Sequence, residues 1–321
     1  MKKFFTGLCM AWGNFCFIPG IKRWDENARS LMLGWLPLIG LVIGGLWAAI
    51  YFGLVYASLP YLLVTFIMAF LPFILSGFIH VDGFMDCNDA MLSRGTLEKK
   101  QSILKDSRCG TFAVVTLIFT ALCFYSALGS AISYGIDFVN LIAITVISRS
   151  VSGLEVLLSK PMATSQYAAM AAEYEEAEEL ADDEDADREI EVTDGTGSVA
   201  EYEETDIAVE LNERADEALD SDNGDDNAEE TDMNVPEKED KPATIQQGVF
   251  LLVAQLILVL ALVGLFCKYY LVTAVVVLGT ALGTLISCII AKKSLGGMNG
   301  DIAGYSIIWG EMIGVIALAL V

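Results

Sequence analysis

The sequence predicts an all-α polytopic membrane protein with about seven transmembrane helices, an N-terminal interfacial helix and a disordered acidic cytoplasmic loop. Three observations predict this class. Hydrophobic residues make up 55% of the 321 residues, and the mean hydropathy is +0.54. Several apolar stretches are long enough to cross a hydrocarbon core of about 30 Å. The net charge of −23 is concentrated in one polar segment.

That polar segment is residues 171–240, which hold 31 acidic and three basic residues. The remaining chain holds 11 acidic and 16 basic residues. Residues 171–240 have few large apolar side chains, so we expect a solvated, disordered insert; binding of cations or of a basic partner is the alternative role. We therefore expect an N-terminal membrane portion with an Asp-rich site (1–170), an acidic insert (171–241) and a C-terminal portion completing the same membrane domain (242–321).

Seven apolar segments have the length of a membrane span. They are residues 32–56, 59–79, 112–133, 138–158, 246–267, 269–291 and 303–321. The first 20 residues begin with two lysines and then become apolar. They lack an A-x-A-like cleavage site, which favours an amphipathic interfacial helix over a cleaved signal peptide.

The distribution of Lys and Arg predicts the orientation of these spans. With the N-terminus in the cytoplasm and the insert left out, 15 basic residues lie on the inner side and only Lys268 on the outer side. We therefore expect a multi-pass membrane protein whose loops 80–111, 159–245 and 292–302 face the cytoplasm. All the polar clusters considered below then lie on that side.

Three aspartates follow the second apolar segment in "HVDGFMDCNDAMLSR". Asp82, Asp86 and Asp89 have the spacing i, i+4 and i+7, which places them on one face of a helix. Like charges stacked in this way repel one another unless a cation neutralises them. Oxygen ligands favour Mg²⁺ or Mn²⁺, and Mg²⁺ commonly completes its shell with water and substrate phosphate. The seven cysteines form no C-x-x-C pair, so neither disulfides nor a zinc site is expected.

Basic groups accompany these acids. Arg108, close to Asp106 in "ILKDSRCGTF", has the planar geometry that holds a phosphate by two contacts. Arg149 lies within an apolar segment, which indicates either a polar cavity or an anchor reaching the inner interface. His80 is the single histidine. It is either a catalyst or a hydrogen-bonded structural residue.

A glycine-rich loop precedes the last span, in "SLGGMNGDIAGYSIIWGEMIG". Gly296, Gly297 and Gly300 can bring backbone N–H groups close to a ligand. We expect Asp301 to cap the following helix. Glu311, about three turns into that helix, is expected to be buried and is a candidate partner for Arg149.

Taken together, "GFIHVDGFMDCNDAMLSR", "ILKDSRCGTF" and "SLGGMNGDIAG" followed by "WGE" resemble the cobalamin-5′-phosphate synthases, also called adenosylcobinamide-GDP ribazoletransferases. The resemblance covers most of the chain outside the insert. Supporting features are "WLPLIGLVIGGLWA", the F-x-P at 17–19 and the Ser-Arg pair at 148–149. Two features depart from the family: Ala90 stands where a glycine is usual, and the acidic insert has no usual counterpart.

The resemblance implies a late step of cobalamin synthesis, in which adenosylcobinamide-GDP is joined to α-ribazole or its 5′-phosphate and GMP leaves. On this basis Mg²⁺ is the expected cofactor, and no nucleic-acid partner is expected. The expected roles are metal ligands (Asp82, Asp86, Asp106, Asp301), catalytic groups (Asp89 as the base, Arg108 on the phosphoryl oxygens, and His80) and substrate-binding groups (Arg149, Gly296, Gly297, Gly300). The sequence leaves open whether the protein is a homo-oligomer.

Three other functions remain open from the sequence. A CDP-alcohol phosphotransferase also places aspartates on membrane helices, but Met85-Asp86 stands where its pattern has Ala-Arg. A prenyltransferase would need a second D-x-x-x-D motif besides Asp82/Asp86. A divalent-cation transporter would need carboxylates along a pathway, whereas here they gather on one side.

Overall fold

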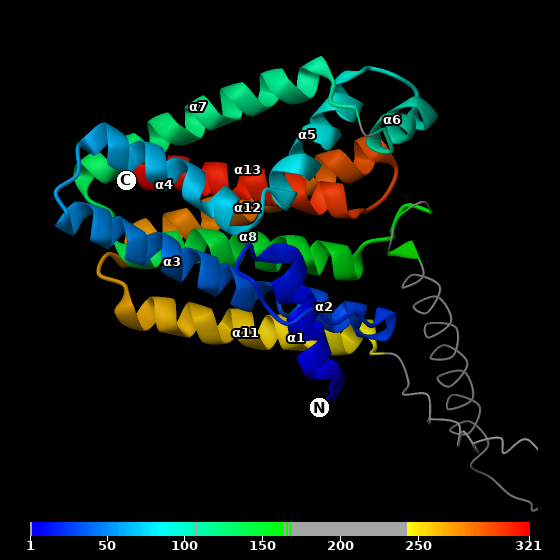
Figure 1. The fold of residues 1–321 in the computed structure, drawn as a ribbon, viewed down its shortest axis with the longest axis horizontal. Helices are drawn as coiled ribbons and strands as arrows, with labels where there is room; N and C mark the ends of the chain where they lie inside the picture. The colour runs from blue at the N-terminus through cyan, green and yellow to red at the C-terminus, as the bar shows by residue number, and fades with distance from the viewer. Residues whose placement is uncertain (1, 107, 164, 166, 169–242) are drawn as a thin grey trace, which may run out of the picture. The chain divides into compact units, whose positions relative to one another are not determined.

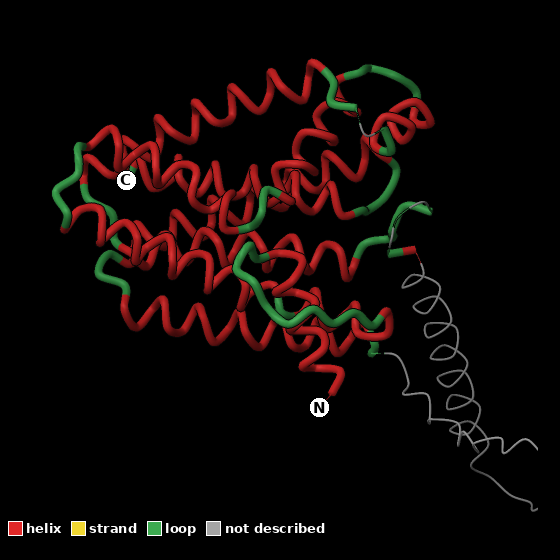
Figure 2. The backbone as a smooth tube through the Cα atoms, viewed as in Figure 1, coloured by secondary structure: helices red, strands yellow, loops and turns green. Residues whose placement is uncertain are grey.

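The computed structural model describes residues 2–106, 108–163, 165, 167–168 and 243–321. Within these residues the chain is helical and contains no β-strand (Figure 2). The helices are α1 (Lys2–Phe15), η1 (Glu26–Ala28), α2 (Arg29–Gly34), α3 (Leu36–Tyr56), α4 (Tyr61–Leu75), α5 (Ile79–Leu92), α6 (Leu97–Leu104), α7 (Thr111–Tyr134), α8 (Phe138–Leu158), α11 (Ile245–Phe266), α12 (Tyr270–Leu295) and α13 (Gly300–Leu320). The predicted acidic insert lies outside the described residues.

Six of the described helices, α3, α7, α8, α11, α12 and α13, are long and apolar enough to cross a membrane. The pair α4 and α5 would make a seventh span if counted as one broken helix. Figure 1 shows α7, α13, α8, α3 and α11 side by side along the long axis of the bundle. The predicted class, an all-α polytopic membrane protein, is confirmed.

The second predicted span, 59–79, is wrong at its end. The helix α4 stops at Leu75, and its 15 residues rise only about 22 Å, less than the thickness of the hydrocarbon core. Gly77 and Phe78 then adopt positive φ angles of 64° and 61°, a left-handed conformation that interrupts a helix. The chain turns by 89° and continues as α5. Hydropathy does not detect this corner, because the residues around it are apolar.

The centre of the bundle is held by close helix contacts at small residues. In α3, a Cβ on Gly40 would lie 2.6 Å from the carbonyl oxygen of Thr145 in α8. The Thr145 hydroxyl donates a hydrogen bond of 2.8 Å to the Gly40 carbonyl. Such contacts between small residues are how helices associate in a bilayer, where no hydrophobic difference separates side chains from lipid.

One end of the bundle gathers the polar loops. In Figure 1, α5 and α6 lie at the same end as the start of α13 and the end of α8. The loop before α13 is tied to the segment after α8, because the Met162 amide donates to the Met298 carbonyl at 2.9 Å and the Met298 amide donates to the Lys160 carbonyl at 3.0 Å. This end carries the aspartates considered next.

Candidate active site at one end of the helix bundle

The helix α5 presents the three aspartates that the sequence placed on one helical face. It is α-helical from Ile79 to Leu92, so the predicted i, i+4, i+7 arrangement of Asp82, Asp86 and Asp89 is confirmed. Asp82 is exposed, whereas Asp86 and Asp89 are half-buried. The face therefore lies partly against the bundle and partly open to solvent.

Contacts at two glycines bring α5 against the first turns of α13. A Cβ on Gly83 would lie 2.7 Å from the carbonyl oxygen of Asp301, and a Cβ on Gly304 would lie 3.1 Å from the His80 backbone. Because α5 runs opposite to α13 at these contacts, Asp86 and the residues after it lie beyond the start of α13, whereas His80 and Phe84 pack beside the first turns of that helix. We therefore place Asp86 and Asp89 at the face of the membrane. Asp301, 212 positions after Asp89, joins the acidic face of α5.

A methyl group at Gly83 should separate these two helices. The contacting atoms of Asp301 are backbone, so they cannot rotate away. We expect Gly83→Ala to lower the free energy of unfolding by about 1–3 kcal/mol, the usual penalty for overpacking. Unfolding of the purified protein in detergent measures this loss.

The matched control for that prediction is Gly45→Ala. Gly45 lies in α3, and a Cβ there would meet no atom within 4 Å. Alanine has the higher helix propensity, so this variant should be as stable as the wild type or slightly more stable. Equal stabilities for the two variants would contradict the close contact between α5 and α13.

Two cavities meet at the start of α13. The first, which we call the N-terminal cavity, has a volume of about 200 Å³ and is bounded by residues of α1, α2, α5, α8 and α13, among them His80 and Asp82. The second, the loop cavity, has a volume of about 250 Å³ and includes Lys105. Gly300 and Asp301 line both cavities. Asp301 therefore borders both spaces.

The carboxylates of the site lie close enough to influence one another. Burial, together with repulsion from Asp82, Asp301 and Asp89, raises the pKa of Asp86 to about 6. A divalent cation shared by these oxygens would relieve that repulsion. The donor set, made only of carboxylate oxygens, suits Mg²⁺.

The same residues do not form a complete metal cage. Among the described residues, no three His, Cys, Asp or Glu side chains are arranged to hold a metal ion by themselves. This fits the habit of Mg²⁺, which takes one or two protein carboxylates and fills its remaining positions with water and phosphate. One or two of Asp82, Asp86 and Asp301 are the carboxylates that would hold the ion in this way.

Asp106 and Arg108 are placed differently from the prediction. The Arg108 guanidinium donates to both carboxylate oxygens of Asp106, with an Nη2–Oδ2 distance of 2.6 Å. These hydrogen bonds hold the pKa of Asp106 at about 2. The Arg108 side chain is 87% exposed and lines neither cavity. In this structure Asp106 is therefore not a member of the cluster around Asp86, because its partner is Arg108.

Asp89 lies at the start of α7. A Cβ atom on Gly110 would lie 2.0 Å from the Oδ2 of Asp89, so the Asp89 carboxylate fills the space beside this glycine. Gly110 precedes the first turn of α7 and provides no side-chain cap. A carboxylate at the N-terminus of a helix is favourably placed with respect to the helix dipole. Asp89 is thus the member of the triad nearest to α7, and it still acts on Asp86.

Arg149 is an interior ion-pair residue. It and Glu311 are each 1% exposed, and the Arg149 Nη1 donates to the Glu311 Oε1 at 2.5 Å. The same nitrogen donates to the Thr145 carbonyl. The predicted ion pair between Glu311 and Arg149 is confirmed. The role of Arg149 in binding a substrate stays a prediction; in the structure its charge is paired inside the bundle and it lines neither cavity.

The glycine loop is folded onto its neighbours. The amides of Gly296 and Gly297 both donate to the Lys292 carbonyl, and Gly297 also packs against Met162. These two amides are therefore not available as a phosphate cradle, which corrects that prediction. Gly300 alone of the three glycines lines the cavities.

The cap of α13 is also different from the one expected. The Oδ1 of Asn299 accepts the hydrogen bond from the Ile302 amide at 2.9 Å, so Asn299 and not Asp301 is the cap. The Nδ2 of Asn299 donates to the Asp301 Oδ2 at 2.8 Å. Asp301 is thereby held in position at the junction of the two cavities.

His80 is buried, with 4% of its surface exposed. Its ring stacks on Phe15 at a centroid distance of 6.1 Å. The ring nitrogens of a histidine can donate and accept hydrogen bonds, so His80 can contact a molecule in the N-terminal cavity that it lines.

The sequence did not single out three residues of the N-terminal cavity. Trp24, Arg29 and Tyr167 line it together with His80. In the sequence Arg29 is one of the 15 basic residues predicted on the inner side, and Trp24 and Tyr167 belong to no motif. No sequence signal links residues 24, 29 and 167, because their proximity depends on how α2 packs against the segment after α8.

The fold and the site together define a polytopic helical membrane protein with an acidic, two-chambered pocket at one end. The family to which it belongs follows from comparison with known proteins. The chain belongs to the cobalamin-5-phosphate synthase family, whose model matches residues 7–181 and 236–319. Residues 182–235, which make up most of the acidic insert, are left out of the match.

Curated relatives agree with this assignment. Over 322 residues, the chain is 28% identical to an adenosylcobinamide-GDP ribazoletransferase of Clostridium perfringens, with both chains fully covered. It is 36% identical to a protein of the same name from Clostridium botulinum over 152 residues, which are 47% of this chain and 60% of the relative. Halalkalibacterium halodurans has another, 38% identical over 120 residues, 37% of this chain and 46% of that one. No solved structure matches.

Proposed function

We propose that the protein is an adenosylcobinamide-GDP ribazoletransferase that acts late in cobalamin synthesis. The observation that carries this proposal is the grouping of Asp86 with Asp82 and Asp301, of which Asp82 lines one cavity and Asp301 lines both, in a member of the cobalamin-5-phosphate synthase family. The relatives carry this enzyme name. Two chambers suit a reaction in which two substrates must meet.

In the proposed reaction, the 3′-hydroxyl oxygen of α-ribazole, or of its 5′-phosphate, attacks the phosphorus that is linked to the corrinoid. A new P–O bond forms, the P–O bond to GMP breaks, and GMP leaves with the electron pair of that bond. The hydroxyl proton passes to a carboxylate of α5, for which we propose Asp89 because it lies on the same helical face as Asp86. The products are GMP and a phosphodiester.

Mg²⁺, held by one or two of Asp82, Asp86 and Asp301, would neutralise negative charge on the diphosphate. The protein's own contribution is to hold these three carboxylates together against their repulsion and to position the substrates. Lys105 in the loop cavity, beside Gln101 and Asn299, is placed to attract the phosphate of the departing GMP. Lys105 takes the role that the sequence assigned to Arg108.

A bacterial cytoplasmic membrane, with the site facing the cytoplasm, is the location that we propose. The 15 basic residues predicted on the inner side include those of α6 and of the end of α12, which lie at the same end of the bundle as the site. The nucleotide substrates are cytoplasmic metabolites, which agrees with this orientation.

The decisive test is turnover by the purified protein. Incubation with adenosylcobinamide-GDP, α-ribazole and Mg²⁺ should yield GMP and a cobalamin product, both separated by chromatography. Omitting Mg²⁺ and adding a chelator should stop the reaction. Release of CMP from a CDP-alcohol, or of pyrophosphate from a prenyl diphosphate, with no GMP from the corrinoid would overturn the assignment.

Most of the acidic insert should be dispensable for this activity. Its flanking residues are tied to one place: the Ala243 amide donates to the Asn27 carbonyl at 2.8 Å, and the Arg29 guanidinium lies 5.7 Å from the centroid of the Tyr167 ring. A flexible linker of about ten residues can bridge such a gap. We expect replacement of residues 171–240 by this linker to preserve turnover and to raise the free energy of unfolding by about 1 kcal/mol, because the closed loop is shorter.

Turnover and thermal unfolding of the shortened protein measure this expectation. A control that replaces the same residues by a neutral Gly/Ser segment of equal length separates the effect of charge from that of length. A loss of activity in both variants would show that the insert contributes to the reaction, contrary to the prediction.

A further inference from the structure

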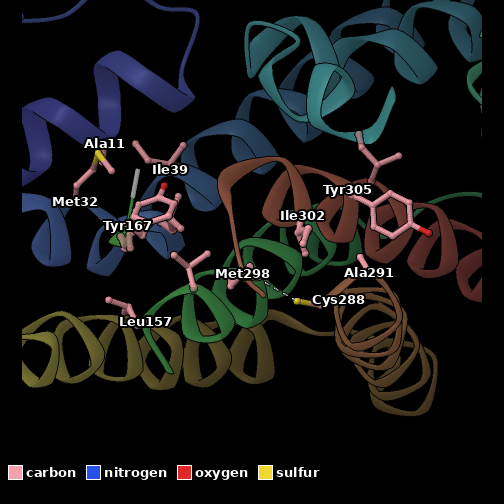
Figure 3. Packing of buried hydrophobic residues seen from close by; sticks show 14 of the residues in the cluster. Ala11, Met32, Ile39, Leu157, Tyr167, Cys288, Ala291, Met298, Ile302 and Tyr305 are labelled. Carbon is pink, nitrogen blue, oxygen red and sulfur yellow. Dashed lines mark hydrogen bonds between the residues drawn. The ribbon is translucent and has the colours of Figure 1, made fainter. Parts of the chain in front are cut away.

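The N-terminal cavity combines aromatic faces with a single basic side chain. Phe15, Trp24 and Tyr167 contribute rings, and the Arg29 guanidinium lies over two of them, 5.5 Å from the Trp24 ring centroid and 5.7 Å from that of Tyr167. The Arg29 side chain is only 12% exposed and also forms an ion pair with Glu26. Figure 3 shows Tyr167 in the same buried cluster as Met32 and Ile39. Arg29 therefore holds part of the aromatic wall in place.

The inner wall of this cavity contains a polar atom without a partner. The Nε2 of His80 is buried and has no hydrogen-bond partner among the described residues. Buried polar atoms are nearly always hydrogen-bonded, because an unsatisfied one costs about 1–3 kcal/mol. Phe15 stacks on the His80 ring, and only 4% of the residue is exposed, so the ring has little contact with water. A bound molecule that offers a polar atom at this point would satisfy it.

The loop cavity has a different character. Its lining is Gln101, Leu104, Lys105, Met162, Ser165, Asn299, Gly300 and Asp301, which provides amide, hydroxyl and ammonium groups and no aromatic ring. The two cavities are therefore unlike: one suits a flat, apolar ring system, and the other suits polar and anionic groups. Asp82 belongs to the first cavity alone, and Asp301 is shared by both.

The two proposed substrates differ in the same way. α-Ribazole is a nucleoside with an apolar bicyclic base, whereas adenosylcobinamide-GDP brings a diphosphate and a polar guanine to the reaction. Stacking on aromatic side chains is the usual way in which proteins hold a base without reading its polar edge. A nucleoside in the N-terminal cavity would place its ribose near Asp82 and Asp301.

From these contacts we propose that the N-terminal cavity is the acceptor subsite, in which Phe15, Trp24 and Tyr167 enclose the base of α-ribazole. His80 Nε2 hydrogen-bonds this nucleoside, and Arg29 positions Trp24 and Tyr167. This assignment rests on the proposed transferase function. It makes Trp24 and His80 determinants of affinity for the acceptor and leaves the corrinoid nucleotide to the loop cavity.

The test compares Michaelis constants for the two substrates. We expect Trp24→Ala and His80→Gln to raise KM for α-ribazole at least tenfold, with KM for adenosylcobinamide-GDP changed less than twofold. Trp24→Phe keeps a ring and should stay within threefold of the wild type. The matched control is Tyr56→Ala, which removes a 91% exposed aromatic side chain at the end of α3 and should alter neither constant.

Direct binding provides a measurement that does not depend on turnover. Calorimetry of the purified protein with α-ribazole alone should give at least tenfold weaker binding for Trp24→Ala than for the wild type, while binding of GMP should be unchanged. Thermal unfolding of each variant shows whether it is folded. If Trp24→Ala does not fold, the comparison is made with Trp24→Phe and His80→Gln.

The outcomes separate the two proposals. A wild type that produces no GMP overturns the transferase function itself. A wild type that turns over, with variants whose KM for α-ribazole is unchanged, overturns only the acceptor subsite. A selective rise in KM for adenosylcobinamide-GDP would also overturn it, because the guanosine would then occupy the aromatic cavity.

Discussion

Asp86→Asn should abolish at least 99.9% of GMP release while leaving a folded, membrane-inserted protein. The neutral amide removes a negatively charged ligand at the point where the substrates' phosphoryl groups carry charge. Loss of one such electrostatic contact commonly lowers kcat by a factor of about 10²–10³. Loss of a metal ligand should lower kcat by a factor of about 10³ or more. Asp82→Asn should behave similarly. GMP release at saturating Mg²⁺ measures both.

The same substitution should make the protein slightly more stable. The pKa of Asp86 is raised to about 6 in the folded protein from an ordinary value of 3.8, so its ionised form opposes folding. A raised carboxylate pKa means that stability declines as pH increases from about 4 to 6 and stays lower above it. Because Asp86 is about half exposed, we expect Asp86→Asn to gain only on the order of 1 kcal/mol at pH 7 without Mg²⁺.

Asp137→Asn is the control for that experiment. Asp137 caps α8 at the other end of the bundle, and asparagine caps helices equally well. This variant should keep wild-type turnover and lose about 1 kcal/mol of stability at most, because only the hydrogen bond from the Lys268 amide to the Asp137 Oδ2 is removed. Full activity of an Asp82→Asn, Asp86→Asn double variant would remove these carboxylates from the reaction and, with them, the metal site.

The second large effect concerns stability. Glu311→Leu should lower the free energy of unfolding by about 3–5 kcal/mol, because Arg149 would remain as an unpaired charge in the interior of the bundle. Adding Arg149→Met removes that charge, and the double variant should recover most of the loss. Denaturant or thermal unfolding in detergent measures the three proteins. A double variant no more stable than Glu311→Leu would show that the ion pair does not account for the loss.

The sequence predicted the membrane helices and the acidic face of α5 because both follow from local patterns. A run of apolar residues shows a span, and the spacing of Asp82, Asp86 and Asp89 shows a face. The 89° corner between α4 and α5 could not be predicted in this way, because the left-handed backbone at Phe78 leaves no mark on hydropathy.

The partners of the charged residues were harder to predict, for reasons of three-dimensional packing. Arg108 has Asp106 two positions away, and a local hydrogen-bonded pair formed in place of the expected phosphate site. Arg149 and Glu311 are 162 positions apart, so only the packing of α8 against α13 brings them together. The aromatic cavity depends likewise on α2 meeting the segment after α8, and no motif records that contact.

The glycine contacts between α5 and α13 have a consequence for how the carboxylates meet their ligands. At Gly83 and Gly304 main chain touches main chain, so no intervening side chain can adjust the spacing of the two helices. Asp86 and Asp301 are thus kept at a fixed separation before any substrate arrives. We expect the site to be preorganised, with its carboxylates held close together despite their mutual repulsion. Little of the free energy of ligand binding is then needed to order these side chains.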